Sequence, residues 1–542
     1  LPAGLCLNEK TGEISGIPTA AGTATFTVKA ENSEGSDTRA LSITVNDAVE
    51  QNPVRYLDAD GKERFCTEYT VLESVIIEDF FNSDNKWYDM PAGWYVVEGD
   101  VTITPRLDTH GAVNLILTDD CHLTVPWGIN VKEGDTFTIY AQSTAEASMG
   151  KLTACLPELS DHEKSVWPVA GLSGIGAGVR VWAANDNFYE NEGTIIINGG
   201  NIHAKGQQAS SAIGGSDYEH NTSYDGDTPG NLRQGGSITI NGGIVCTELR
   251  TSGGAHLSDS FGIGTCGGNG GSVTINGGTI NITSGNDGIN TNEDNVSVTT
   301  VNGGSVNIQV TGETGEGDGI DSNGWLVING GAVTAAACSD SGDAGIDATM
   351  GITINGGTVA ASGNMYDQID GGAQNYVVFS FASRQNGGQT YTLQNADGET
   401  VGTWTPANDF TCLVVSSPDL TAGDYTLWQG DTQLAGTMSD GVGSPGGGRH
   451  MGGEAPPADL DPWQAPEGEV PENASSEVPG DPPERPDGEM EPDGRESPAG
   501  GHGPGGGEGG QSAAGLSKTF TLSDGGSFFN GLSPTETTEA SE

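Results

Sequence analysis

The stretch Ser272-Val-Thr-Ile-Asn-Gly-Gly-Thr-Ile-Asn-Ile282 decides the fold of this chain. On both sides of its Asn-Gly-Gly corner, β-branched residues alternate with polar ones, and this period of two predicts two strands joined by a sharp turn. We expect the corner glycines to supply the positive φ that such a turn requires. An apolar-Asn-Gly-Gly phrase occurs six times, with its asparagine at Asn198, Asn241, Asn276, Asn302, Asn329 and Asn355.

The spacing of these asparagines indicates a repeat architecture, because successive steps are 43, 35, 26, 27 and 26 residues. A second phrase, usually a small residue followed by Ile and then Gly, Asp or Asn, alternates with the first and is centred on Ile175, Ile213, Ile263, Ile289, Ile320, Ile346 and Ile369. Each repeat therefore predicts a strand, a corner, a second strand and a second corner. Stacked repeats pair every strand in parallel about 4.8 Å from its neighbours, and stacked asparagines can hydrogen-bond to one another. We predict an all-β chain built mainly as a right-handed parallel β-helix.

Composition restricts the partners of the chain. Its 542 residues carry a formal net charge of −54, which disfavours nucleic acid and anionic membranes as partners because both would be repelled. No apolar run approaches the roughly 20 residues of a membrane span, so we expect no membrane insertion. The eight cysteines show no CxxC or metal-finger spacing, and we interpret them as small buried hydrophobic residues.

Changes in composition divide the chain into seven segments. We expect part of an Ig-like β-sandwich over 1–47, a connector over 48–89, the parallel β-helix over 90–372, an antiparallel β cap over 373–439, a disordered Gly/Pro/acidic tract over 440–515, a returning strand that pairs with the cap over 516–531, and a tail over 532–542.

The informative chemistry lies at the second corner of the later repeats, where acidic and amide residues recur in register. Carboxylates about 4.8 Å apart repel by on the order of 3 kcal/mol at an effective dielectric near 20, so a stack of them needs protons or a cation. Because the ligands are oxygens, with no His or Cys, the pattern favours calcium. The alternative is a row of solvated corners, since Asp and Asn are ordinary turn formers. The candidate calcium ligands are Asp287, Asn290, Asp318, Asp321, Asp343, Asp347, Asp367 and Asp370.

Amide and aromatic side chains near these corners are candidates for contact with sugar rings, although packing or loop anchoring would explain each aromatic equally well. The candidates are Asn292, Asn323, Trp325, Tyr366, Tyr218 and Tyr224.

Two parts of the chain resemble known families. Residues 1–47 resemble the Ig-like, cadherin-like module found in strings on bacterial surface proteins. The phrases Gly317-Asp-Gly-Ile-Asp-Ser-Asn-Gly324, Asn-Gly-Gly and Phe381-Ala-Ser-Arg-Gln-Asn-Gly-Gly388 resemble the carbohydrate-binding β-helix family of clostridial surface proteins, over roughly 90–440 and 516–531. That resemblance implies a pectate-lyase-like solenoid that binds pectin through calcium, with Asp318 and Asp321 at its acidic corner. Ala344 and Gln368 depart from the pattern.

We therefore expect a non-catalytic, extracellular protein, on the bacterial surface or secreted, that binds acidic plant polysaccharide (pectin or polygalacturonate) through corner-bound calcium. We expect it to act as a monomer within a larger surface protein. Calcium would convert the repulsion between two anions into a bridge.

Two other functions remain open. The first is a pectin lyase or glycoside hydrolase. A lyase needs a placed base, but no Lys or Arg occurs between Arg250 and Arg384, so only Lys205, Arg233 or Arg250 in a neighbouring coil could serve. A hydrolase needs paired carboxylates, which are plentiful, although polygalacturonase signatures are not assembled. The second is a surface stalk or adhesin.

Overall fold

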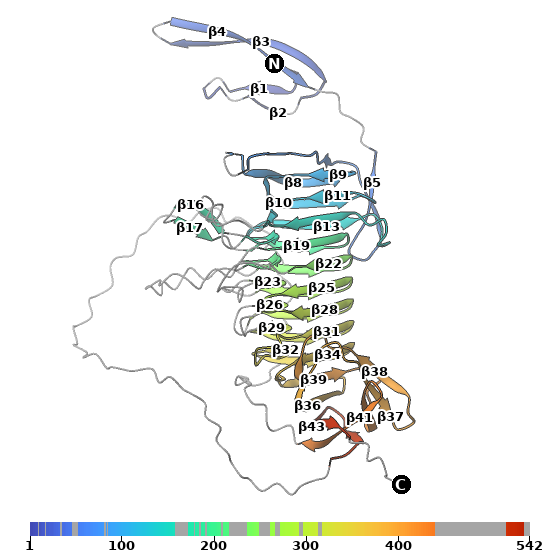
Figure 1. Ribbon diagram of the computed structural model, residues 1–542. Helices are drawn as coiled ribbons and strands as arrows, with labels where there is room; N and C mark the ends of the chain where they lie inside the picture. Colours follow the sequence, from blue (N-terminus) through green and yellow to red (C-terminus); the bar gives the residue numbers. More distant parts are fainter. Residues whose placement is uncertain are drawn as a thin grey trace, which may run out of the picture.

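The computed structural model is all-β, and every regular element among the described residues is a strand (Figure 1). In this part of the chain no helix is long and apolar enough to cross a membrane. The described residues are 1–8, 10–12, 14–16, 18–32, 35–45, 52–80, 83, 85–157, 172–177, 179–183, 186–189, 192–206, 210–215, 236–248, 261–265, 271–291, 296–312, 317–439 and 516–535.

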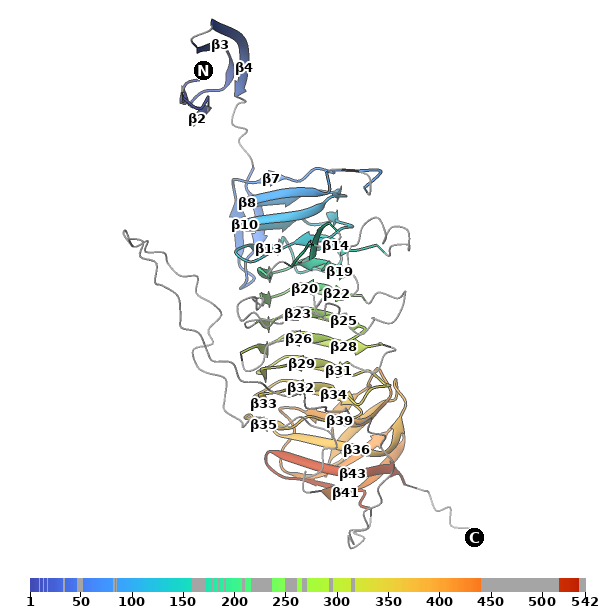
Figure 2. The same ribbon diagram turned by 90° about the vertical axis from the view of Figure 1, so that its left-hand side faces the viewer.

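Three ladders of mostly parallel strands make up the central part of the molecule, and Figures 1 and 2 show their strands stacked in chain order. The first ladder contains β7 (Thr70–Val71), β8 (Trp87–Val97), β10 (Arg106–Leu117), β13 (Thr136–Ala141), β18 (Thr194–Ile197), β21 (Ser237–Ile240), β24 (Ser272–Ile275), β27 (Val298–Val301), β30 (Trp325–Ile328), β33 (Gly351–Ile354) and β35 (Ile369–Gly371). The second contains β9 (Asp100–Thr102), β11 (His122–Thr124), β14 (Lys151–Cys155), β19 (Asn201–Lys205), β22 (Ile244–Thr247), β25 (Thr279–Ser284), β28 (Ser305–Val310), β31 (Ala332–Ala336) and β34 (Thr358–Gly363).

The third ladder is built from short strands at the Gly-Ile corners. It starts at the beginning of β10 and continues through β12 (Ile129–Asn130), β15 (Ile175–Gly176), β20 (Ile213–Gly214), β23 (Ile263–Thr265), β26 (Ile289–Thr291), β29 (Ile320–Ser322) and β32 (Ile346–Ala348). The hairpin β16 (Val179–Ala183) and β17 (Asp186–Tyr189) lies outside the ladders.

The Asn-Gly-Gly corner holds successive repeats in register. The second glycine of each phrase has a positive φ, for example 83° at Gly304 and 85° at Gly357, as the sequence predicts. The predicted asparagine stacking is confirmed: the side-chain amide of Asn302 donates to Asn276 Oδ1 at 2.8 Å, and that of Asn329 donates to Asn302 Oδ1 at 2.8 Å. The same bond joins the other neighbouring pairs from Asn198 to Asn355 at 2.7–2.8 Å.

One continuous hydrophobic core fills the space between the ladders. Ile240, Ile275 and Val301 occupy equivalent positions in β21, β24 and β27, and each is fully buried. The alternation that predicted the strands therefore also decides which side chains face the core.

The ladders begin earlier than the sequence indicated. The expected connector over 48–89 contains the first residues of β8 and also β7, which pairs in parallel with Tyr95 and Val96 of β8. It also contains the hairpin of β5 (Val54–Leu57) and β6 (Glu63–Cys66), whose Val54 and Cys66 pack on Val96 and Ile116. The hairpin thus covers apolar side chains that point away from the main core in the first repeats. From strand alternation alone, these side chains would be expected to face solvent.

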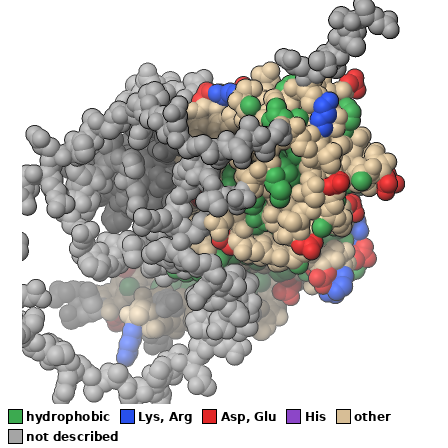
Figure 3. All heavy atoms as spheres, turned by 90° about the horizontal axis from the view of Figure 1, so that it is seen from below, with side chains coloured by type: hydrophobic (Ala, Val, Ile, Leu, Met, Phe, Trp, Pro, Cys, Tyr) green, Lys and Arg blue, Asp and Glu red, His purple; other side chains and the backbone are tan. Residues whose placement is uncertain are grey.

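The C-terminal strands are mostly antiparallel and enclose a second core. They are β36 (Tyr376–Gln385), β37 (Tyr391–Asn395), β38 (Thr400–Trp404), β39 (Phe410–Ser416), β40 (Gly423–Gln429), β41 (Thr432–Ser439), β42 (Phe520–Leu522) and β43 (Gly526–Pro534). β43 pairs in parallel with β36 and antiparallel with β41, and β39 pairs with β34 of the second ladder. Figure 3, viewed from this end of the molecule, shows Asp and Glu side chains around the visible rim, with hydrophobic side chains between them. The tract expected to be disordered, 440–515, lies outside the described residues.

The N-terminal strands form two separate antiparallel pairs, β1 (Leu5–Leu7) with β2 (Ile14–Gly16) and β3 (Gly22–Asn32) with β4 (Gly35–Val45). This is less than a full β-sandwich. Most described cysteines are buried or half-buried as expected, but Cys6 in β1 is exposed.

Candidate metal centre

The third ladder brings the predicted acidic corners into register. Gly264 of β23 pairs with Asn290 of β26, Asn290 pairs with Asp321 of β29, and Asp321 pairs with Asp347 of β32. Since neighbouring parallel strands lie about 4.8 Å apart, the outward side chains at these positions form a column. The column changes from glycine to amide to carboxylate along the chain.

Three carboxylates meet at one place in this column. One oxygen from each of Asp318, Asp321 and Asp347 lies within 4.8 Å of the other two, and all three residues are half-buried. Asp318 joins the group because it precedes Asp321 by three residues, at the turn that leads into β29. The spacing Asp-Gly-Ile-Asp thus places both of its carboxylates at the same edge.

Asp287 and Asn290 extend the group by one repeat. Asp287 Oδ1 accepts a hydrogen bond from the Asp318 backbone N–H at 2.8 Å, and its Oδ2 accepts one from Asn290 Nδ2 at 2.6 Å. Asn290 Nδ2 also lies 3.3 Å from Asp321 Oδ2. Asn290 is only 5% exposed, and its Oδ1 has no hydrogen-bond partner. A buried carbonyl oxygen without a donor is costly, and a cation would satisfy it.

The electrostatics of the group also favour a cation. Burial, followed by the negative charge of Asp287, raises the pKa of both the Asp318 and Asp321 carboxyls well above their ordinary value. The charge of Asp347 contributes in the same direction at both. No Lys or Arg occurs in the sequence between Arg250 and Arg384, so this stretch supplies no positive side chain of its own.

Asp343 also belongs to the neighbourhood of the three carboxylates. Its Oδ2 accepts from the Gly317 backbone N–H at 2.5 Å, and its charge contributes to the raised pKa of Asp318 and Asp321. Ala344, which departs from the acidic pattern, contacts the group through its backbone, because its N–H donates to Asp318 Oδ1 at 2.6 Å. These backbone contacts orient the carboxylates, and the residue pattern alone gave no signal for them.

Asp367 and Asp370 are engaged differently. Asp367 accepts from the backbone N–H groups of Ala348 and Gln368, at 3.1 and 2.7 Å. Asp370 accepts from the Ile352 N–H at 3.0 Å and from Gln368 Nε2 at 3.1 Å. Neither is one of the three residues whose oxygens lie within 4.8 Å of one another. Both residues accept hydrogen bonds from groups near the last strands of the first and third ladders.

The structure describes three of the six predicted sugar-contact residues. Trp325 at the start of β30 is only 6% exposed, which leaves little ring surface for a sugar. Tyr366 is half-buried and packs on Phe528, with ring centroids 5.7 Å apart. Asn323 is half-buried, and its backbone N–H donates to Thr291 O at 3.0 Å. The other three candidates, Asn292, Tyr218 and Tyr224, lie outside the described residues.

The donor set fits calcium. Hard carboxylate oxygens from two repeats, a spare amide oxygen and half-buried positions are what a calcium ion takes as ligands in proteins. Asp318, Asp321, Asp347 and Asn290 would hold the ion, which would supply positive charge to the column and coordination positions for an outside ligand.

Comparisons with known families agree with a sugar-binding role. A family model described as "Carbohydrate-binding domain-containing protein" matches residues 265–370, a range that includes every predicted metal ligand. A second family, "Putative Ig domain", matches residues 1–46. No curated protein and no solved structure matches the chain. The first match supports a carbohydrate-binding role, and the second agrees with an Ig-like N-terminal segment.

Proposed function

We propose that this chain is a non-catalytic carbohydrate-binding protein whose central part is a right-handed parallel β-helix. Calcium at the acidic corner would recognise acidic plant polysaccharide such as polygalacturonate. The observation that supports it most is the convergence of Asp318, Asp321 and Asp347 beside the partnerless Asn290 Oδ1. The carbohydrate-binding family match covers the same residues.

The charge of the chain explains why a metal would be needed. Polygalacturonate is an anion, and a protein of formal charge −54 repels it at low ionic strength. A calcium ion held by the three carboxylates retains coordination positions that sugar carboxylates can fill. Binding would then require calcium and would weaken with salt.

The strand pairings support the proposed fold. Parallel ladders whose neighbouring strands come from successive repeats, with a core between them, are the arrangement of a solenoid. We also propose extracellular placement, on the surface or secreted, which the match of the N-terminal segment to an Ig-like family supports. The proposal includes action as a monomer within a larger surface protein.

A lyase is the second candidate, and the position of Lys205, the one possible base among the described residues, disfavours it. Lys205 ends β19 in the second ladder, whereas the acidic corner belongs to the third. Arg233 and Arg250 lie outside the described residues. Lys205 belongs to another ladder, and a calcium ion that lacks a base beside it would hold the polymer but not cleave it.

The test is a calorimetric titration of the full chain with polygalacturonate, in calcium and again with chelator, while ultraviolet absorbance monitors unsaturated product. We expect calcium-dependent binding without product. The double variant Asp318→Asn and Asp321→Asn should lose it, whereas Asp397→Asn, an exposed turn residue of the C-terminal strands, should not. Product formation would indicate a lyase, and equal binding by the double variant would contradict the proposal.

A further inference from the structure

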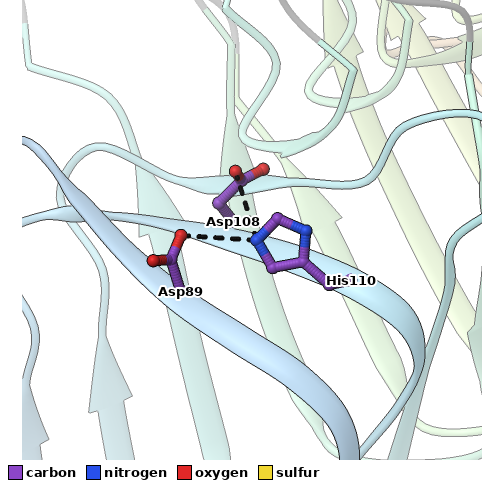
Figure 4. Close-up of side chains that lie close together, drawn as sticks. All are labelled: Asp89, Asp108 and His110. Atoms are coloured by element: carbon purple, nitrogen blue, oxygen red, sulfur yellow. Dashed lines mark hydrogen bonds and ion pairs between the residues drawn. The ribbon is translucent and has the colours of Figure 1, made fainter. Parts of the chain in front are cut away.

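A second group of metal-ligating side chains lies in the first repeats, well before the acidic corner. One oxygen each of Asp89 and Asp108 and a ring nitrogen of His110 lie within 4.8 Å of one another. In Figure 4 the imidazole Nε2 faces both carboxylates. It lies 3.3 Å from Asp89 Oδ1 and 3.6 Å from Asp108 Oδ2. Four strands of the third ladder, β12, β15, β20 and β23, separate Asp108 from the strand of Asn290.

These three residues lie on two paired strands, just before the irregularity between His110 and Val113. Asp89 of β8 and Asp108 of β10 are direct partners in the parallel pairing of these strands. His110 follows Asp108 by two residues in the same strand, so both side chains point to the same face. All three residues of the group therefore belong to paired strands and not to a loop.

The residues differ in exposure in a way that suits a metal site open to solvent. Asp108 is 4% exposed, whereas the side chains of Asp89 and His110 are 74% and 44% exposed. Asp108 Oδ1 accepts hydrogen bonds from Asn130 Nδ2 at 2.9 Å and from Lys132 Nζ at 3.1 Å. These bonds hold Asp108 with its Oδ2 toward His110, as outer partners orient a metal ligand.

The two oxygens of Asp108 have different neighbours. Lys132 Nζ lies 3.1 Å from Asp108 Oδ1 and 3.9 Å from Asp135 Oδ2. The other oxygen, Asp108 Oδ2, lies 3.6 Å from His110 Nε2. The ammonium group and the imidazole therefore contact different oxygens of Asp108, and Oδ2 is the one placed to join His110 at a metal.

We propose that Asp89, Asp108 and His110 bind a divalent transition metal ion such as zinc. The ring nitrogen distinguishes this group from the oxygen-only acidic corner, because imidazole is a preferred ligand of zinc and of similar ions. Bonds of 2.0–2.2 Å at tetrahedral angles place ligand atoms about 3.4 Å apart. The distances from His110 Nε2 to the two carboxylate oxygens, 3.3 and 3.6 Å, match that separation. Water would complete the coordination on the exposed side.

The test is a calorimetric titration of the metal-stripped full chain with zinc chloride at neutral pH. We expect one binding event that weakens at least tenfold in His110→Ala and in Asp89→Asn. The matched control is His203→Ala, because the His203 ring also faces a carboxylate, Glu248 Oε1 at 2.7 Å, and has a similar exposure of 38%. It should leave the event unchanged.

Two further measurements separate this site from a structural ion pair and from the acidic corner. His110→Ala should keep the thermal unfolding transition of the parent, so that a lost event reflects ligation and not unfolding. The Asp318→Asn and Asp321→Asn double variant should retain the zinc event. If the parent shows no zinc binding, or if His110→Ala binds zinc as the parent does, the three residues form an ion pair only and the proposal is wrong.

Discussion

Asn290 and Asp321 face each other across neighbouring strands of the third ladder, with Asn290 Nδ2 3.3 Å from Asp321 Oδ2. The pair marks the point where the corner column changes from amide to carboxylate. An amide beside a carboxylate is attractive, whereas the next pair in register, Asp321 with Asp347, is repulsive when both are ionised. The energetics of the corner should therefore depend on calcium.

We expect the effect of Asp321→Asn on the free energy of unfolding to depend on calcium. With chelator at neutral pH, removing one of several adjacent charges should stabilise the fold by on the order of 1–3 kcal/mol. In calcium at about 100 times its dissociation constant, the variant should lose roughly 2.7 kcal/mol of ligand-derived stability relative to the parent. Chemical denaturation in both conditions measures this. An effect of the same size in both conditions would contradict a calcium site here.

The raised pKa of Asp318 and Asp321 predicts a pH dependence in the absence of calcium. A carboxyl whose pKa is higher in the folded state binds more protons when folded, so its contribution to stability declines as pH rises from the ordinary carboxyl range through the raised value. Relative to the parent, the double variant Asp318→Asn and Asp321→Asn should therefore gain stability as pH rises from about 4 to 7. A pH-independent difference would show that neither carboxyl titrates abnormally.

Each hydrogen bond between stacked asparagines should contribute separately to the stability of the fold. Asn302→Ala removes two side-chain bonds, one to Asn276 and one from Asn329, and should cost about 1–2 kcal/mol. Asn355 makes only the bond to Asn329 among the ladder bonds, so Asn355→Ala should cost about half as much. Equal losses in thermal unfolding would mean that the corner backbone, and not the ladder, determines the effect.

Alanine substitutions at two glycines with nearly equal φ can distinguish the cost of backbone strain from the cost of a steric clash. Gly134 has a φ of 84°, and a Cβ there would meet no atom within 4 Å, so Gly134→Ala should cost only about 1–2 kcal/mol. Gly304 has a φ of 83°, but a Cβ there would lie 2.8 Å from Gly278 O in the repeat before it. Gly304→Ala should therefore be clearly more destabilising in denaturant titrations. Similar losses would show that the stack can relax around a methyl group.

The periodic part of the fold follows from local patterns, and for that reason much of it could be predicted. Each short repeat contains a strand, an Asn-Gly-Gly corner and an isoleucine that faces the core. The burial of a residue such as Ile275 can therefore be predicted from its neighbours in the sequence alone. The register of Asp321 with Asp347 follows equally from the spacing of the phrases. The cluster of carboxylates at the candidate site could be predicted from the sequence for the same reason.

What could not be predicted depends on contacts between distant residues. Nothing near Val54 or Cys66 indicates that their hairpin packs on Val96 and Ile116. The group of Asp89, Asp108 and His110 was missed because it lies before the recognisable repeats and joins residues of two separate strands. Its only sequence signal is Asp-Thr-His, in which two ligands alternate on one strand face, and this is too short to be specific.

The last pair of strands gives a test of how the C-terminal part is held together. Residues 440–515, between β41 and β42, lie outside the described part of the chain, yet Phe520 and Phe529 are buried in the second core, where both rings contact Phe379. β43 is also paired on both sides, with β36 and β41.

We expect a specific protease site inserted between 440 and 515 to yield two fragments that elute together in gel filtration, because cleavage there breaks none of these contacts. Ending the chain at residue 515 should instead expose Phe379 and lower the unfolding temperature or cause aggregation. Separation of the cleaved fragments under native conditions would show that β43 is held by its tether and not by its pairing.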